Sequence, residues 1–194
     1  MEILITPRLT IRPPIAYDAD DITHLLQEWD VAKMLSRIPW PYSTIDAENW
    51  LATMGDPEKQ IYTIHRHGLI GVAGFAGSGN ARNLGYWLGK PWHGHGFMRE
   101  ALTLLLNKVF ADQQISNIDS SVIFDNLASL KLQAGLGFEF TGETEIESIA
   151  RKAKVQAVKT VLTREAWRAR AEFGLSKQKY LDQPQLNKLD GHLG

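Results

Sequence analysis

The chain has 194 residues, 44% of them hydrophobic, and a formal net charge of −1 at pH 7. This composition suits one globular domain with a substantial core, and the nearly balanced charge gives no whole-chain reason to bind nucleic acid or an acidic membrane. The absence of cysteine excludes disulfides, thiol nucleophiles and thiolate metal sites, and no run approaches the ~18 apolar residues needed to cross a bilayer. We therefore expect a cytoplasmic protein, a monomer or homodimer, with no nucleic-acid or membrane partner.

Hydrophobic periodicity, proline breaks and capping residues predict alternating short helices and strands. The expected strands cover residues 4–11, 60–65, 69–76, 84–88, 117–124, 138–149 and 155–163. The expected helices cover residues 16–29, 31–37, 44–54, 97–112, 126–135 and 164–173. Ser43 or Thr44 is the expected cap of the third helix. This mixture predicts an α/β sheet protein with helices on both faces, and the polar stretch 174–194 is assigned as a C-terminal tail after a single domain, 1–173.

The segment between the second and third helices, Pro39 to Tyr42, places large side chains in a stretch without helical or strand period. A structural plug is one interpretation of Trp40 and Tyr42. The other interpretation is that these aromatic side chains wall a substrate site.

The central stretch, residues 83–112, passes from a buried strand through a glycine-bearing turn into a long apolar helix. Unpaired amides at such a helix start bind anions, and Gly94 and Gly96 allow close backbone approach. A P-loop is excluded because Gly96 is not followed by Lys and Ser or Thr, and a dinucleotide fingerprint is excluded because Arg99 stands where its third glycine belongs. A glycine turn that merely enters a core helix remains an alternative.

The residues of this stretch resemble the acetyl-CoA pyrophosphate loop of GNAT-type N-acetyltransferases. The similarity rests on Tyr86-Trp87-Leu88 and on the run from Trp92 to Ala101, and it points to the RimJ/RimL branch, whose members acetylate protein N-terminal amines. Pro91 departs from the Gln or Arg that is common at the start of this loop. The resemblance implies a GNAT fold, in which a mostly antiparallel central sheet opens at a splayed strand pair that holds acetyl-CoA.

A second motif, Asn126-x-x-Ser129 followed by Gly137-Phe138, resembles the N-x-x-S…G-F motif of the same family. Taken alone, Asn126 would be interpreted as a helix cap. The resemblance implies that Asn126 binds the CoA arm and that Ser129 is catalytic, stabilising or protonating the leaving thiolate, directly or through water. The cofactor-binding residues implied in this way are Trp87, Leu88, Gly89, His93, Gly94, His95, Gly96, Phe97, Met98, Asn126 and Ser129.

The implied reaction moves acetyl from acetyl-CoA directly to an amine, with backbone N–H groups near Leu88 as oxyanion donors and Trp40 and Tyr42 as substrate-binding residues. The family commonly has an acid where this chain has Asn83, so the general base stays open among Glu143, Asp119, His65 and a water chain. Without an evident carboxylate, a protein N-terminal α-amine is favoured, because its pKa of ~7.7–8.0 needs far less lowering than the ~10.4 of lysine.

Three alternatives remain. One is a non-catalytic acyl-CoA-binding or sensing module, which Asn83 and the lack of a tyrosine near Phe138 and Phe140 would favour. Another is acetylation of a small-molecule amine. The last is a metal site built from His65, His67, His93 and His95, although the expectation is an enzyme without a metal.

Overall fold

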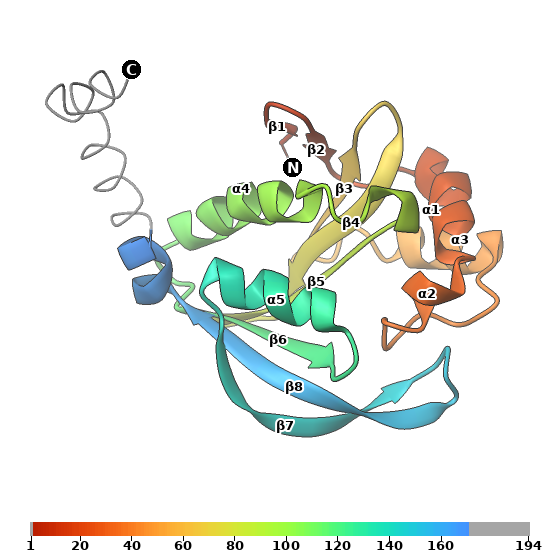
Figure 1. The fold of residues 1–194 in the computed structure, drawn as a ribbon. Helices are drawn as coiled ribbons and strands as arrows, with labels where there is room; N and C mark the ends of the chain where they lie inside the picture. Colours follow the sequence, from red (N-terminus) through yellow and green to blue (C-terminus); the bar gives the residue numbers. More distant parts are fainter. Residues whose placement is uncertain (1, 171–194) are drawn as a thin grey trace, which may run out of the picture.

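The computed structural model describes residues 2–170, which form one eight-stranded sheet with helices on both faces (Figure 1). The strand order is β1-β2-β3-β4-β5-β6-β8-β7. The strands are β1 (Leu4–Ile5), β2 (Thr10–Arg12), β3 (Lys59–His65), β4 (Leu69–Ala76), β5 (Ala81–Leu88), β6 (Asn117–Ile123), β7 (Glu139–Ser148) and β8 (Ala153–Thr163). The helices are η1 (Ala16–Asp18), α1 (Ala19–Leu26), α2 (Trp29–Ala32), α3 (Thr44–Ala52), η2 (Lys90–Trp92), α4 (Phe97–Ala111) and α5 (Leu127–Leu136), and residues 164–170 are also helical.

The expected α/β class and mostly antiparallel sheet are confirmed, and the differences lie in the first 40 residues. The helix expected over residues 16–29 is instead the 3-10 turn η1 followed by α1, which ends at Leu26, and the helix expected over residues 31–37 is wrong in its bounds, because α2 covers Trp29–Ala32. The single strand expected over residues 4–11 is wrong: a turn in which the Thr6 N–H donates to the Leu9 carbonyl (2.9 Å) splits it into the antiparallel pair β1 and β2. Ser43 caps α3 as expected, accepting from the Asp46 N–H. The last three residues of the expected final helix and the whole 174–194 tail lie outside the described residues. None of the helices within 2–170 is long and apolar enough to cross a membrane.

The sheet opens at β5 and β6, which run parallel while the other neighbouring pairs in the described sheet are antiparallel. The two strands pair only through 81–83 on β5 and 117–119 on β6. Beyond these residues β5 continues to Leu88 and β6 to Ile123 without pairing with each other. The splay expected between these strands is therefore present, and it leaves the inner backbone edge of β5 open.

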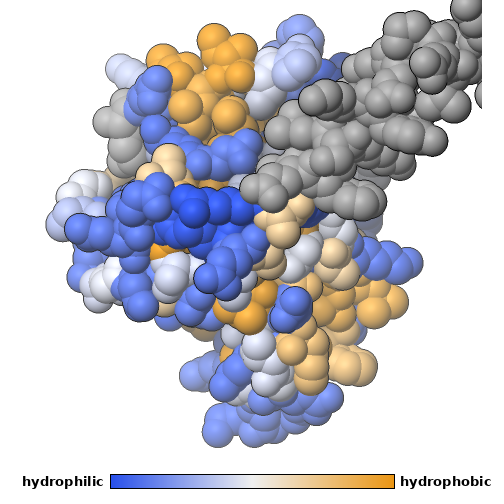
Figure 2. Space-filling view, turned by 90° about the vertical axis from the view of Figure 1, so that its left-hand side faces the viewer, coloured by the Kyte–Doolittle hydropathy of each residue, from blue (hydrophilic) through white to orange (hydrophobic). Residues whose placement is uncertain are grey.

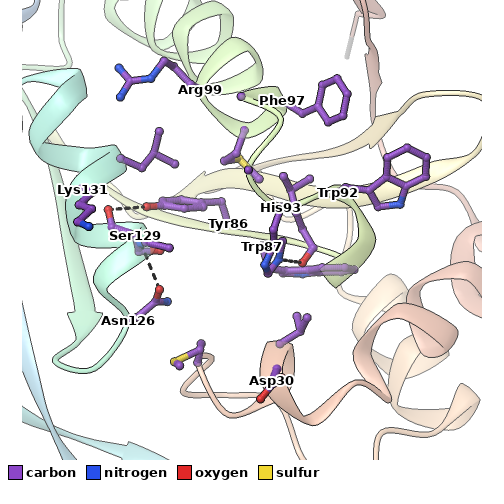
Figure 3. A pocket seen from close by; sticks show the side chains of 18 of the residues that line it. Asp30, Tyr86, Trp87, Trp92, His93, Phe97, Arg99, Asn126, Ser129 and Lys131 are labelled. Carbon is purple, nitrogen blue, oxygen red and sulfur yellow. Dashed lines mark hydrogen bonds between the residues drawn. The ribbon is translucent and has the colours of Figure 1, made fainter.

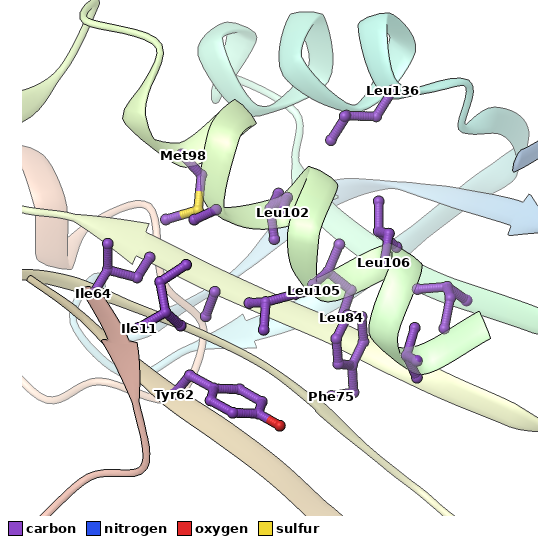
Figure 4. Packing of buried hydrophobic residues seen from close by; sticks show 14 of the residues in the cluster. Ile11, Tyr62, Ile64, Phe75, Leu84, Met98, Leu102, Leu105, Leu106 and Leu136 are labelled. Atoms are coloured by element: carbon purple, nitrogen blue, oxygen red, sulfur yellow. The ribbon is translucent and has the colours of Figure 1, made fainter. Parts of the chain in front are cut away.

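The main core lies between the sheet and α4 (Figure 4). The apolar stripe of α4 that the sequence predicted is buried, and Leu102 and Leu106 have no exposed surface. It packs on side chains from β2, β3, β4 and β5, among them Ile11, Ile64 and Phe75. Burying each such side chain contributes roughly 1.5–3 kcal/mol. The first turn of α4, which follows the glycine loop, is therefore held rigidly against the open edge of β5.

The other face of the sheet is covered by α1 and α3, which form a second cluster around Ile22, Leu26, Tyr42 and Leu69. Trp87 of β5 packs against this second cluster, whereas Leu84 and Leu88 belong to the α4 cluster. This alternation follows the two-residue period of a strand. On the outside, Figure 2 shows one side of the molecule on which a band of hydrophilic residues separates two hydrophobic areas.

Candidate active site

A cavity of about 390 Å³ lies where β5, the start of α4, the start of α5 and the α2 region meet; we call it the first cavity (Figure 3). Its wall includes Trp87, Leu88, His93, Gly94, Gly96, Phe97, Met98, Asn126 and Ser129, all of which the sequence singled out as cofactor-binding. Gly89 and His95, which were singled out with them, do not line it. The structure thus brings two motifs that are about 30 residues apart in sequence to one site.

The loop that enters α4 presents a row of free backbone amides. The N–H groups of residues 94–99 donate no hydrogen bond to any other residue among 2–170, and the first helical bond is that of the Glu100 N–H to the Gly96 carbonyl (3.0 Å). Gly94 and Gly96 have φ of +78° and +77°, values that L-residues with a side chain rarely adopt. A Cβ built on Gly94 would meet no atom within 4 Å. The loop therefore leaves open space beside unpaired donors at a helix N-terminus, which is an anion-binding arrangement.

Arg8, which the sequence analysis did not single out, anchors this loop from the turn between β1 and β2. Its Nη1 donates to the His95 carbonyl (3.0 Å), and its guanidinium pairs with Glu100 in the first turn of α4 (2.6 Å). The guanidinium groups of Arg8 and Arg66 each lie over the Phe97 ring, 4.6 Å from its centroid. Pro91 supplies no side-chain hydrogen bond to the loop, and Arg8 holds the loop from outside instead.

At the end of β5 the backbone N–H of Leu88 points into the gap where β5 and β6 separate. The Gly89 N–H donates to the Ile70 carbonyl of β4 (2.9 Å), so the alternation of an antiparallel strand turns the Leu88 N–H away from β4 and toward the gap. His93 Nε2 donates to the Leu88 carbonyl (2.9 Å), which fixes the chain where it leaves the strand. The expected oxyanion donor near Leu88 therefore points into the splay, while the Gly89 amide is already occupied.

The start of α5 places Asn126 and Ser129 on the opposite wall. Asn126 is the N-cap: its side-chain oxygen accepts from the Ser129 N–H at 3.2 Å. Asn126 and Ser129 both line the first cavity and the second cavity described below. Asn126 is thus a helix cap and a cavity residue at the same time, so the two interpretations of this motif do not exclude each other.

Sequence reasoning missed Tyr86. Its hydroxyl lies 3.5 Å from the Ser129 carbonyl oxygen, and the residue lines both cavities (Figure 3). Burial raises the pKa of Tyr86, while hydrogen bonds to Ser129 and Gln133 oppose this shift. Only the position of Tyr86 directly before Trp87 in the first motif could have indicated that it lies at this site.

A buried polar network ties α5 to the sheet at the root of the splay. Gln133, only 1% exposed, donates from Nε2 to Ser120 Oγ (2.9 Å) and accepts from Thr160 Oγ1 (2.6 Å). Ser120 Oγ donates in turn to the Leu84 carbonyl (3.2 Å), the first β5 carbonyl beyond the paired residues. A side-chain bridge therefore replaces the backbone ladder where the strands separate.

The second cavity, of about 660 Å³, adjoins the first one. The two cavities share Met34, Leu35, Tyr86, Trp87, Asn126 and Ser129 as lining residues. Tyr42 lines the second cavity from the α1–α3 cluster, and burial raises its pKa to about 12. Trp40 lines neither cavity; its ring packs edge-on against Trp29 (4.9 Å), and its Nε1 donates to the Gln27 carbonyl. The α2–α3 segment thus contributes Tyr42 to this wall and turns Trp40 away.

None of the three candidate bases lines either cavity. Asp119 is paired beside Asn83 where the splay begins, Glu143 lies on the edge strand β7, and His65 contacts Thr63 at 3.0 Å on β3. Burial, with Arg12 nearby, lowers the pKa of His65. Within residues 2–170, no three His, Asp or Glu side chains gather closely enough to hold a metal ion, so the two histidine pairs do not form a common ligand set.

The charged groups of the first cavity come from three elements. Arg99 of α4 and Lys131 of α5 line it, as does Asp30 of α2. Asp30 is ion-paired with Lys33 and Lys90 (2.5 Å each), and these lysines lower its pKa to about 2. Arg99 belongs to the loop motif, so the sequence could have placed it at this site, whereas nothing in the sequence indicated that Asp30 or Lys131 lies there.

Comparison with known proteins agrees with this geometry. The family description "Acetyltransferase (GNAT) domain" matches residues 8–139. Uncharacterized N-acetyltransferase p20 of Bacillus licheniformis is 30% identical over 151 residues, covering 73% of this chain and 85% of that protein. The ribosomal protein uS5-alanine N-acetyltransferase of Escherichia coli K12 is 30% identical over 166 residues, covering 72% of this chain and 79% of that protein.

A solved structure shows the same fold. RimL, described as a ribosomal L7/L12 alpha-N-protein acetyltransferase in complex with coenzyme A, superposes with a TM-score of 0.73 at 18% identity, over 85% of this chain and 99% of that one. The matched domain, the two relatives and the splayed sheet with its glycine loop lead to one conclusion. The chain belongs to the GNAT acetyltransferase family and is an N-acetyltransferase.

Proposed function

We propose that this enzyme takes acetyl from acetyl-CoA and transfers it to the α-amine of a protein N-terminus. The observation that carries the proposal is the row of unpaired amides at residues 94–99, beside the open space at Gly94. Such a cradle fits the diphosphate of coenzyme A, because a helix N-terminus favours an anion by about 0.3–1 kcal/mol, and more when partly buried. The coenzyme A bound to RimL and the uS5-alanine specificity of the Escherichia coli relative support the donor and the acceptor class.

Different residues around the first cavity bind different parts of acetyl-CoA, the co-substrate that supplies an activated acetyl thioester. The amides of the loop bind the diphosphate, and Arg99 and Lys131 add positive charge at the wall. Asn126 holds the arm from α5. The Leu88 N–H, directed into the splay, polarises the acetyl carbonyl as an oxyanion donor.

Proton donation is assigned to the junction of the two cavities. Tyr86 Oη holds its proton at neutral pH because burial raises its pKa, so it can donate a proton to the leaving sulfur. Ser129 Oγ lies on the same wall and either donates directly or orients a water there. Tyr86 therefore joins Ser129 as a candidate catalytic residue.

The scarcity of carboxylates in the two cavities supports an α-amine as the acceptor. Asp30 is the one carboxylate among the described residues that line either cavity, and it is paired with two lysines. An amine entering mainly apolar walls has its pKa lowered by desolvation. An α-amine with a pKa of ~7.7–8.0 then needs little further help to be neutral at pH 7, whereas lysine at ~10.4 would need more than ~4 kcal/mol.

Two measurements test the proposal. Calorimetry should detect coenzyme A binding, and thiol release should be faster with a peptide bearing a free α-amine than with a matched Nα-blocked peptide bearing one lysine. Equal turnover of the two peptides would contradict the α-amine assignment. Binding of acetyl-CoA without acetylation of any amine in a broad panel would identify a non-catalytic acyl-CoA-binding module instead.

A further inference from the structure

The charge distribution in the second cavity is one-sided. Of the described residues that line it, Arg37 is the one that carries a full charge at neutral pH, since the others are apolar, small or neutral polar. Tyr42 and Tyr86 stay neutral because burial raises the pKa of both. No aspartate or glutamate of residues 2–170 reaches this wall. A ligand in this cavity therefore meets positive charge and apolar surface.

The Arg37 guanidinium is available to a ligand. It makes no ion pair or side-chain hydrogen bond with any residue from 2 to 170, and the side chain is exposed. The carboxylates on neighbouring elements are engaged elsewhere: Asp30 of α2 pairs with Lys33 and Lys90, and Asp125 before α5 pairs with Arg151.

The acidic strand nearby faces the other way. Ile146 of β7 lines the second cavity, so its neighbours Glu145 and Glu147 point to the opposite face of the sheet. These glutamates are exposed, and Glu145 accepts from the Gln156 side chain (3.0 Å). They do not neutralise the field of Arg37 inside the cavity.

This arrangement disfavours a polycationic acceptor. An acceptor with several ammonium groups would place them beside a guanidinium with no carboxylate to offset the repulsion, and burying an unpaired charge is costly. An acceptor carrying a carboxylate would instead satisfy the free donors of Arg37, because a guanidinium binds a carboxylate through two parallel hydrogen bonds.

We propose that Arg37 selects acceptors whose α-amine is followed by an acidic side chain, so that the preferred substrate is an acidic protein N-terminus. The proposal rests on the function proposed above and specifies its substrate class. The amine enters the junction at Tyr86 and Ser129, and the following residues extend along the second cavity, whose volume is in the range that takes a drug-sized ligand. The carboxylate of one of those residues pairs with Arg37.

The test uses three peptides of the same length that differ at one position near the N-terminus, where they carry Glu, Gln or Lys. For the wild-type enzyme, kcat/KM should be about fivefold higher for the Glu peptide than for the Gln peptide, with the Lys peptide lowest. The Glu preference should shrink in 1 M NaCl because salt screens a partly exposed pair. A series with Glu moved from the second to the fourth residue identifies the position that reaches Arg37.

Variants of Arg37 test whether this residue causes the preference for the Glu peptide. Arg37→Gln should bring the three peptides to similar kcat/KM, and Arg37→Glu should reverse the order. Arg168→Gln, which removes the same charge from an exposed arginine that lines neither cavity, should keep the wild-type order.

The outcomes separate the two proposals. Equal wild-type rates for the three peptides, or an unchanged Glu preference in Arg37→Gln, would overturn the assignment of Arg37 while leaving the α-amine function intact. Failure to acetylate any of the peptides, together with turnover of a small-molecule amine, would overturn the proposed function and this inference with it. The wild-type comparison needs no variant, so a folding defect cannot obscure it.

Discussion

At the scale of single residues, Gly94 shows how a backbone conformation creates a binding site. Its φ of +78° turns the chain so that the following amides point away from α4, and the absence of a Cβ leaves the space beside them open. A side chain there would have to adopt an unfavourable backbone conformation and would also fill that space.

We expect Gly94→Ala to weaken coenzyme A binding at least tenfold in calorimetry, because the new methyl group fills the space where the diphosphate would bind. The backbone strain should cost about 1 kcal/mol of folding stability. Gly79→Ala is the matched control: Gly79 has φ of +70°, a Cβ there would also meet nothing within 4 Å, and it lines neither cavity. The control should lose similar stability but keep its affinity. Equal affinity in both variants would place the diphosphate elsewhere.

A second prediction at this scale distinguishes Tyr86 from Ser129 as proton donor. Tyr86→Phe should lower kcat by about 100-fold with little change in KM for acetyl-CoA, because general acid catalysis typically contributes 10²–10⁴-fold. Ser129→Ala should lower kcat less if the serine only orients water. In the wild type, kcat should fall at alkaline pH, above the ordinary tyrosine pKa of ~10, because burial raises the pKa of Tyr86.

The control for that pair is Tyr62→Phe, which removes a hydroxyl from a tyrosine that lies in the α4 core and lines neither cavity. It should leave kcat unchanged. If Tyr86→Phe retains wild-type kcat at all pH values, the proton comes from Ser129 or from water.

At the scale of elements, α5 is held on the sheet by the polar side chain of Gln133 as well as by the apolar contacts of Leu132 and Leu136. Both polar ends of the Gln133 side chain are used, one by Ser120 of β6 and one by Thr160 of β8. The same helix carries Ser129 one turn earlier. The buried network therefore sets the distance between the Ser129 wall and the open edge of β5.

We expect Gln133→Met to destabilise the fold by about 2 kcal/mol, because it leaves the Ser120 and Thr160 hydroxyls buried without Gln133 as their partner. Denaturant unfolding measures this loss, and steady-state kinetics should show a lower kcat as Ser129 shifts. Adding Ser120→Ala and Thr160→Val should recover part of the stability, since it removes the two hydroxyls that had lost Gln133, although the Leu84 carbonyl then loses the Ser120 hydroxyl as its donor. Wild-type stability in Gln133→Met would mean that α5 is held by its apolar contacts alone.

At the scale of the whole molecule, the sheet also holds titratable groups that line neither cavity, and His65 is one of them. Burial, with Arg12 nearby, lowers its pKa below the ordinary 6.5. The unfolded chain therefore binds a proton at a higher pH than the folded chain does. The stability that comes from neutral His65 is complete above pH 6.5 and is lost as the pH falls toward the lower folded pKa.

We therefore expect wild-type stability to fall between pH 7.5 and pH 5.5 more steeply than that of His65→Asn, which cannot take up this proton. Urea unfolding at the two pH values measures the difference. Equal slopes would show that His65 titrates alike in the folded and unfolded chains, and acetylation kinetics should not follow this residue because it lines neither cavity.

Much of the fold followed from local patterns. The apolar stripe of α4 predicted the helix that is buried against the sheet, and Ser43 marked the start of α3. The strand expected over 4–11 was wrong because a four-residue turn at Thr6 to Leu9 is stabilised by its own hydrogen bond and interrupts a weak alternation. Propensity alone cannot distinguish one strand with an irregularity from two short ones.

The sequence by itself determined the glycine loop, the capped start of α5 and the family, because each depends on residues adjacent in the chain. Only the tertiary structure decided which other side chains lie at the site. Tyr86 is turned toward Ser129, and Arg8 holds the glycine loop from behind. Arg37 lines the second cavity, which has no carboxylate among the described residues, whereas Trp40 packs on Trp29 and lines neither cavity. The physical reason is that each of these positions depends on how different elements pack together: Tyr86 on the separation of β5 and β6, and Arg8, Arg37 and Trp40 on where the turns that carry them lie against the rest of the fold. The residues adjacent to a position in the sequence do not indicate which tertiary contacts its side chain will make.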